Sequence, residues 1–266
     1  MSRHYDIVRL RAGEGIEVGT ASVTVDLDKI TPKDVIQNDD EFNSSLQPEH
    51  YFYVSGGGSF LFRGRYLLTV RRPLTARVHP GKLSIFTGRA EGLHEWREPW
   101  RVVRELFEEV VLFEGRKIFY PRFPPYQEII DEVYRTHFTD KFSRDFAYAD
   151  IKLEAVPLGE RILRVVSEGC SSEYRLSYHI NSKNDINVLS LFAVDLDPHE
   201  IRVLDAEDLN SSREICLLDI ETGDVMVVGQ GSANQWQVVE PGDMTEHLSA
   251  MLGLITRKLP GEVCVS

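Results

Sequence analysis

Three glutamates between residues 105 and 109 have the clearest capacity for chemistry in this sequence. Glu105, Glu108 and Glu109 stand at positions i, i+3 and i+4, so a helix places all three carboxylates on one face. Like charges at this spacing repel one another by about 0.2–0.5 kcal/mol per pair, so a positive group should compensate them. Arg104 starts on a neighbouring face and is not expected to compensate all three alone. Divalent cations that take oxygen ligands, Mg²⁺ or Mn²⁺, would do so. The alternative is an acidic helix face solvated by water.

The sequence around these acids resembles the Nudix box, in which a glycine loop precedes a helix of pattern Arg-Glu-apolar-x-Glu-Glu-x-Gly-apolar. Residues 104–109 match the first half of that helix, and Leu112 fills its last apolar position. Two features depart from the pattern. Val111 stands in place of the glycine, and the interval from Gly88 to the helix is longer than the family has.

The resemblance implies hydrolysis of a diphosphate bond in a nucleotide derivative, a nucleoside diphosphate linked to another group. Mg²⁺ or Mn²⁺ neutralises the diphosphate and makes a bound water a better nucleophile. The metal ligands that the resemblance implies are Glu105, Glu108, Glu109 and the backbone carbonyl of Gly88. Arg104 is expected to hold the box together by ion pairing. Glu207 is the candidate for an additional general base from a later loop, and its alternative is a plain surface acid.

A second resemblance concerns the substrate. The stretch 67–72, with Arg77 and 86–88, is similar to the signature of coenzyme A-cleaving Nudix enzymes, although Arg72 replaces its serine. Guanidinium groups bind phosphate through paired hydrogen bonds. The substrate-binding candidates are therefore Arg71, Arg72 and Arg77, and the alternative for them is a solvated strand end.

The departures from the pattern leave a second class of function open. A Nudix-like module that binds a nucleotide for regulation, without turnover, would tolerate both Val111 and the longer loop. Three crowded acids favour the enzyme, because a pure binding module has no need to keep them. A third alternative is an unrelated α+β protein whose helix matches the pattern by chance.

Composition sets limits on these functions. The chain has 266 residues, of which 42% are hydrophobic and 27% charged, as in ordinary globular proteins. The net charge of −12 argues against a dedicated nucleic-acid binder, but not against a phosphate ligand that carries a cation. Three cysteines without metal-type spacing suit a reducing compartment, so a cytoplasmic location is expected. No apolar run is long enough to span a membrane, and no membrane partner is expected.

The helices and strands around these acids can be predicted from the spacing of apolar residues. Apolar residues at helical spacing predict helices over 99–113, 126–137 and 244–259. Alternating and β-branched stretches predict strands at 21–27, 50–55, 59–62, 66–70, 83–86, 151–156, 162–166, 174–180, 188–194 and 215–218. Residues 63–65 are a turn signal between two of these strands. Three consecutive glycines at 56–58 predict a bulge or the close approach of another backbone.

Strands and helices mix without regular βαβ alternation, which favours an α+β fold. The resemblance, which covers about 50–113 well and 185–258 loosely, implies a Nudix-type α/β/α sandwich with a mixed sheet. The predicted domains are an N-terminal extension at 1–49, a Nudix domain at 50–258 with an insertion at about 114–185, and a tail at 259–266. The aromatic insertion must cover either the chain's own core or a second copy. The family resemblance favours a homodimer, with Phe138 and Phe142 as interface candidates.

Overall fold

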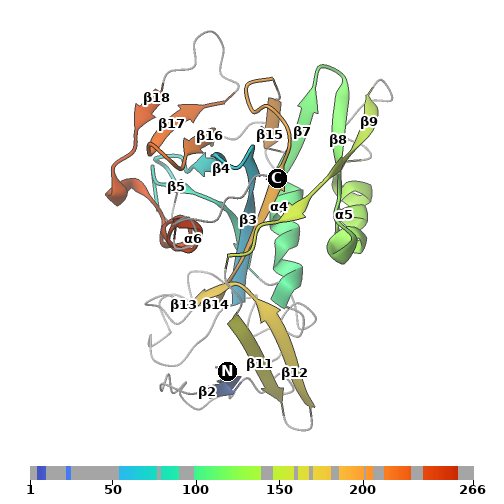
Figure 1. Ribbon diagram of the computed structural model, residues 1–266, viewed down its shortest axis with the longest axis vertical. Helices are drawn as coiled ribbons and strands as arrows, with labels where there is room; N and C mark the ends of the chain where they lie inside the picture. Colours follow the sequence, from blue (N-terminus) through green and yellow to red (C-terminus); the bar gives the residue numbers. More distant parts are fainter. Residues whose placement is uncertain are drawn as a thin grey trace, which may run out of the picture. The chain divides into compact units, whose positions relative to one another are not determined.

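A computed structural model gives the arrangement of the chain (Figure 1). The residues that it describes are 5–9, 22–24, 54–76, 79–89, 99–138, 146–158, 161–167, 170–180, 186–200, 202–205, 213–228 and 236–256. The chain divides into two compact units. The first comprises Met1–Gly56, Gly88–Val102 and Gly159–Leu189, and the second comprises Gly57–Thr87, Val103–Leu158 and Ser190–Ser266. Sheets dominate and helices are few, so the predicted α+β class is confirmed.

The first unit contains a four-stranded sheet. Its strand order is β12 (Cys170–Leu176), β11 (Arg161–Ser167), β1 (Tyr5–Arg9) and β2 (Ser22–Thr24). The β11–β12 pair is an antiparallel hairpin, whereas β1 runs parallel to both of its neighbours. In the same unit, β13 (Tyr178–Ile180) pairs antiparallel with the beginning of β14 (Ile186–Val194). The predicted strand at 174–180 is therefore present in two pieces.

The second unit is built on a larger sheet. Its strand order is β10 (Glu154–Ala155), β14, β3 (Val54–Phe62), β4 (Tyr66–Arg71), β16 (Glu214–Asp219), β17 (Asp224–Val227) and β18 (Trp236–Val238). Two short strands add at its side, β5 (Leu83–Ser84) to β4 and β6 (Phe86–Arg89) to β3. The predicted 83–86 strand is thus divided between β5 and β6. The predicted hairpin is confirmed, since Phe62 pairs with Tyr66 across the turn.

The glycines at 56–58 lie where other backbone segments approach β3. A Cβ on Gly57 would lie 1.8 Å from the carbonyl oxygen of Phe86. A Cβ on Gly58 would lie 2.6 Å from the carbonyl oxygen of Ser190. Because real Cβ atoms essentially never come within 3.0 Å of such an atom, the predicted close approach is confirmed and requires glycine.

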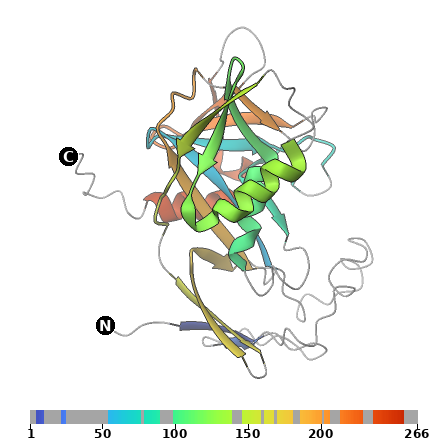
Figure 2. The ribbon, with the colours of Figure 1, turned by 90° about the vertical axis from the view of Figure 1, so that its right-hand side faces the viewer.

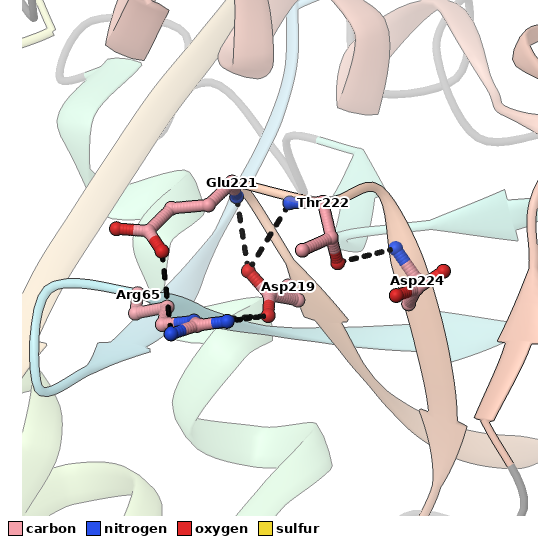
Figure 3. A network of polar contacts seen from close by, with 5 residues as sticks. All are labelled: Arg65, Asp219, Glu221, Thr222 and Asp224. Atoms are coloured by element: carbon pink, nitrogen blue, oxygen red, sulfur yellow. Dashed lines mark hydrogen bonds and ion pairs between the residues drawn. The ribbon is translucent and has the colours of Figure 1, made fainter.

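A polar network closes the turn end of the β4–β16 ladder, where Tyr66 pairs with Asp219 (Figure 3). Arg65 donates to Asp219 Oδ2 from Nε at 2.9 Å and from Nη2 at 2.6 Å. The other oxygen of Asp219 accepts the backbone N–H groups of Glu221 and Thr222 at 3.0 and 3.4 Å. Burial by itself would raise the pKa of Asp219. The hydrogen bonds from Arg65 and the two amides, with the charge of Arg65, outweigh burial and lower that pKa.

A second sheet in this unit has the order β15 (Arg202–Asp205), β7 (Val110–Glu114), β8 (Lys117–Arg122) and β9 (Ala147–Lys152). Helix α5 (Gln127–Val133) lies against it and continues as a π-helix, η3 (Tyr134–Phe138) (Figure 2). The hydroxyl of Tyr134 donates to the carbonyl of Phe119 in β8 at 3.4 Å. Ile129, Ile130, Val133 and Tyr134 are buried as the periodicity predicts.

Phe138 is fully buried within its own chain, and its ring centroid lies 4.8 Å from that of Tyr134. It serves internal packing, so its predicted place in a dimer interface is wrong. Phe142 lies outside the described residues. The homodimer itself stays a prediction, as do the predicted domain and insertion boundaries.

The helix that carries the glutamates is shorter than its periodicity predicts. A 3₁₀ turn, η1 (Pro99–Val103), leads into α4 (Arg104–Glu109), and the chain is extended from Val110 onward. Val110–Glu114 is instead β7, which pairs with β8 on one side and β15 on the other. Its β-branched and aromatic residues suit a strand, and two ladders of hydrogen bonds outweigh the helical continuation. Because the helix has already ended, Val111 occupies a strand position and no helix-terminating glycine is required there.

Aromatic side chains anchor α4 to the larger sheet. The ring centroid of Phe107 lies 6.3 Å from that of Phe60 in β3 and 5.7 Å from that of Phe192 in β14. Both Leu106 and Phe107 are fully buried, so the packing of their side chains fixes the position of the helix and of the glutamates that it carries. The closing helix, α6 (Glu246–Thr256), buries Leu248, Met251 and Ile255 as predicted, whereas Leu252 is half-buried. None of the described helices has the length and apolar character that crossing a membrane requires.

Candidate functional site

The three glutamates of α4 are largely covered. Their side chains are exposed to 13% at Glu105, 15% at Glu108 and 7% at Glu109. These low values exclude a freely solvated acidic face, the alternative that the spacing left open. Carboxylates this far from bulk water need close partners, because burying an unpaired charge is costly.

Arg104 supplies a partner for two of the three acids. Its Nη1 donates to both carboxylate oxygens of Glu108, at 2.9 and 2.7 Å, and its Nη2 lies 3.1 Å from Oε1 of Glu105. The expectation that Arg104 starts on a neighbouring face is wrong with respect to Glu108, because residues four positions apart share one helix face. The guanidinium of Arg104 therefore holds two acids of the same helix in place.

Glu109 finds its partner far away in the sequence. Nη1 of Arg213 donates to Oε1 of Glu109 at 3.2 Å. Arg213 immediately precedes β16, so the strand register of the larger sheet brings it to α4. Sequence analysis missed Arg213. The one signal that could have found it is its position beside the predicted strand at 215–218, and that signal requires the strand pairing to be known.

Of the three arginines predicted to bind the substrate, the structure describes Arg71 and Arg72. Both lie at the end of β4, but their environments differ. Arg71 pairs with Glu214 on β16, with 3.5 Å between Nε and Oε2. Arg72 follows it, and its Nε is buried without a hydrogen-bond acceptor among the described residues. Burial, followed by the like charge of Arg213, lowers the pKa of the Arg72 guanidinium, and the charge of Glu109 acts in the opposite direction.

The three glutamates of α4 are suitable ligands for a divalent cation, because carboxylate oxygens are the ligands that Mg²⁺ and Mn²⁺ prefer. The arrangement divides these oxygens between guanidinium partners, Arg104 for two acids and Arg213 for the third. Within the part of the chain that the structure describes, no three acidic, histidine or cysteine side chains are grouped as metal ligands. A bound cation would therefore share these carboxylates with their guanidinium partners.

For three predicted site residues, a place near this cluster stays a prediction. Gly88 lies in β6 and belongs to the first unit, while α4 belongs to the second, so its role as a carbonyl ligand stays a prediction. Arg77 and Glu207 lie outside the described residues. The structure thus unites Glu105, Glu108, Glu109 and Arg104 with Arg72 and Arg213.

Comparisons with known proteins give no family for this chain. No protein-family model, no curated protein and no solved structure matches it. The likeness to the Nudix pattern therefore rests on the residues between Gly88 and Glu109 and on the predicted elements around them. The function of the chain therefore has to be inferred from the side chains of the site and their contacts.

Proposed function

We propose that this chain hydrolyses a diphosphate bond in a nucleotide derivative with the help of Mg²⁺ or Mn²⁺. The observation that carries the proposal is the nearly buried carboxylate of Glu109 beside the guanidinium groups of Arg213 and Arg72. Acids for a cation and arginines for phosphate are the two kinds of group that phosphoryl chemistry needs. A Nudix-type sandwich, a cytoplasmic location and a homodimer belong to the same proposal.

Each residue has a distinct part in this proposal. Glu105, Glu108 and Glu109 would hold the cation, which when bound neutralises the diphosphate and lowers the pKa of a bound water. Arg104 is a positioning residue, because it orients two of these carboxylates through its ion pairs. Arg72 would bind a phosphate group of the substrate, with Arg71 and Arg77 as further candidates. Glu207 remains the candidate for a general base from a later loop.

A second function has an observation of its own in its favour. Every carboxylate of α4 already has a guanidinium partner, so the helix is stable without a cation. A module that binds a nucleotide without turnover would need no more than this arrangement. We therefore keep regulatory nucleotide binding as the alternative.

A hydrolysis panel separates the two functions. Nucleotide sugars, ADP-ribose, dinucleoside polyphosphates, coenzyme A and nucleoside triphosphates are incubated with Mg²⁺ or Mn²⁺, and released phosphate or monophosphate is measured. Glu108→Gln and Glu109→Gln should each lower the rate by about 10²-fold or more, since the cation supplies several kcal/mol of barrier reduction.

The matched control is Glu114→Gln, because Glu114 is an exposed acid at the end of β7 that pairs with Lys117. Its rate should stay within about twofold of wild type. Calorimetry with Mn²⁺ should show metal binding that both helix variants weaken and the control does not. Nucleotide binding without hydrolysis of any panel member would establish the alternative function instead.

A further inference from the structure

The end of the β4–β16 ladder brings two arginines together. Arg71 stands opposite Glu214 in the ladder, so opposite charges face each other at the last pair. Arg72 follows Arg71 and Arg213 precedes Glu214, so both residues lie just beyond this last pair, and the charge of Arg213 acts on Arg72. Like charges that lie close together repel each other. Two guanidinium groups at this position therefore need a compensating anion.

The backbone of Arg72 is anchored to the segment that precedes β5. Its N–H donates to the carbonyl of Lys82 at 3.0 Å, and its carbonyl accepts the N–H of Gly81 at 3.1 Å. Its Nε is buried and has no acceptor among the described residues. A buried donor left unsatisfied costs about 1–3 kcal/mol. An acceptor atom from a ligand would recover that cost.

Glu109 is the resident anion beside the two arginines. Its Oε1 accepts a hydrogen bond from Nη1 of Arg213. The charges that act on Arg72 are the positive charge of Arg213 and the negative charge of Glu109. The carboxylate of Glu109 thus lies near both guanidinium groups, while in the described part of the chain the Nε–H of Arg72 has no acceptor.

We propose that Arg72 and Arg213 form a subsite for a phosphate group, which competes with Glu109 for Arg213 and supplies the missing acceptor to Nε of Arg72. A terminal phosphate carries a charge of about −1.5 to −2 at pH 7 and three strong acceptor oxygens. It can therefore engage both guanidinium forks at once. A small carboxylate has one charge and two oxygens, so it cannot displace Glu109 as effectively. This inference deepens the proposed function, on which it rests, by naming the residues that anchor the substrate's phosphate.

The test measures binding in the absence of metal, so that it does not depend on turnover. Inorganic pyrophosphate and AMP are titrated by calorimetry into the full chain in low-salt buffer with EDTA, and acetate is titrated as the carboxylate probe. Pyrophosphate and AMP should bind, and Arg72→Met and Arg213→Met should each raise Kd by about tenfold or more. Arg72→Lys, which keeps the charge but loses Nε–H, should raise Kd several-fold. The matched control is Arg63→Met, because Arg63 is an exposed arginine that pairs with Asp197, and its Kd should equal that of wild type.

Glu109→Gln separates this inference from the proposed function. It should bind pyrophosphate more tightly than wild type, because the competing charge is gone, yet it should lose hydrolysis. Equal pyrophosphate affinity in wild type and Arg72→Met, weaker binding by Glu109→Gln, or acetate binding as tight as pyrophosphate would each overturn the subsite. If the binding pattern holds but nothing is hydrolysed, the proposed function fails and the subsite stands. If hydrolysis depends on Glu109 while the arginine variants keep wild-type affinity and KM, the subsite fails and the proposed function stands. Thermal unfolding of every variant confirms that it is folded.

Discussion

Strand β4 is flanked by Arg65 at its beginning and Arg72 at its end, and the charged neighbours of these two arginines differ in sign. At the beginning, Arg65 meets Asp219, whose second oxygen is held by two backbone amides (Figure 3). At the end, the like charge of Arg213 acts on Arg72, and Nε of Arg72 has no acceptor among the described residues. In the first arrangement the charges of Arg65 and Asp219 compensate each other. In the second, the buried Nε–H of Arg72 could bind an added anion. Under the proposed phosphate subsite, the Arg65 end serves stability and the Arg72 end serves ligand binding.

Removing the acid at the satisfied end should have the largest effect on stability. Asp219→Asn loses the charge that two Arg65 nitrogens and two amides share, and its side chain is only 5% exposed. The free energy of unfolding, measured by urea denaturation, should fall by about 2 kcal/mol. Glu221→Gln is the control, because that side chain is 65% exposed and its pair with Arg65 should contribute less than about 0.5 kcal/mol. A loss in the control as large as in Asp219→Asn would contradict the contrast between a buried and an exposed partner.

Replacing each arginine by methionine should give effects of opposite sign. Arg72→Met keeps the aliphatic stem but removes a like charge from Arg213 and a buried unsatisfied donor. Its free energy of unfolding should rise by about 0.5–1 kcal/mol, as at sites where function is maintained at the expense of stability. Arg65→Met should instead lower the unfolding temperature, because it leaves Asp219 without its cation. Urea and thermal unfolding of the two variants measure this, and a change of the same sign in both would refute the comparison.

Acid should weaken the satisfied end by a smaller amount. The pKa of Asp219 is lower in the folded chain than its unfolded value of about 3.9. A depressed folded pKa means that the stabilisation is fully present above the unfolded value and is lost as pH falls through the folded value. Between neutral pH and about pH 4 the difference in stability between wild type and Asp219→Asn should therefore stay constant, and below about pH 4 it should shrink. Urea denaturation across this range tests the expectation, which a pH-independent difference down to pH 2 would disprove.

Features of short sequence range could be predicted. The 63–65 turn, the buried stripe of α5 and the core positions of α6 all follow from neighbouring residues, and each is found. The glycines of β3 were predicted to meet another backbone, and they do. The end of α4 could not be predicted from periodicity, because Val110–Glu114 reads equally well as helix or strand. Only its pairing with β8 and β15 decides between them.

The local sequence is sufficient to predict that three carboxylates share the face of α4 and that Arg104 stands beside them, because these are relations within two helical turns. It also placed Arg71 and Arg72 at the end of a strand. By contrast, the pairing of Arg213 with Glu109, more than one hundred positions away, and the nearness of its charge to Arg72 depend on how the chain folds. The physical reason is that strand register sets charge partners across a ladder, and register depends on how distant segments pack. The local sequence therefore contains the acids and arginines, whereas the fold brings Arg213 to Glu109 and buries Nε of Arg72 without an acceptor among the described residues.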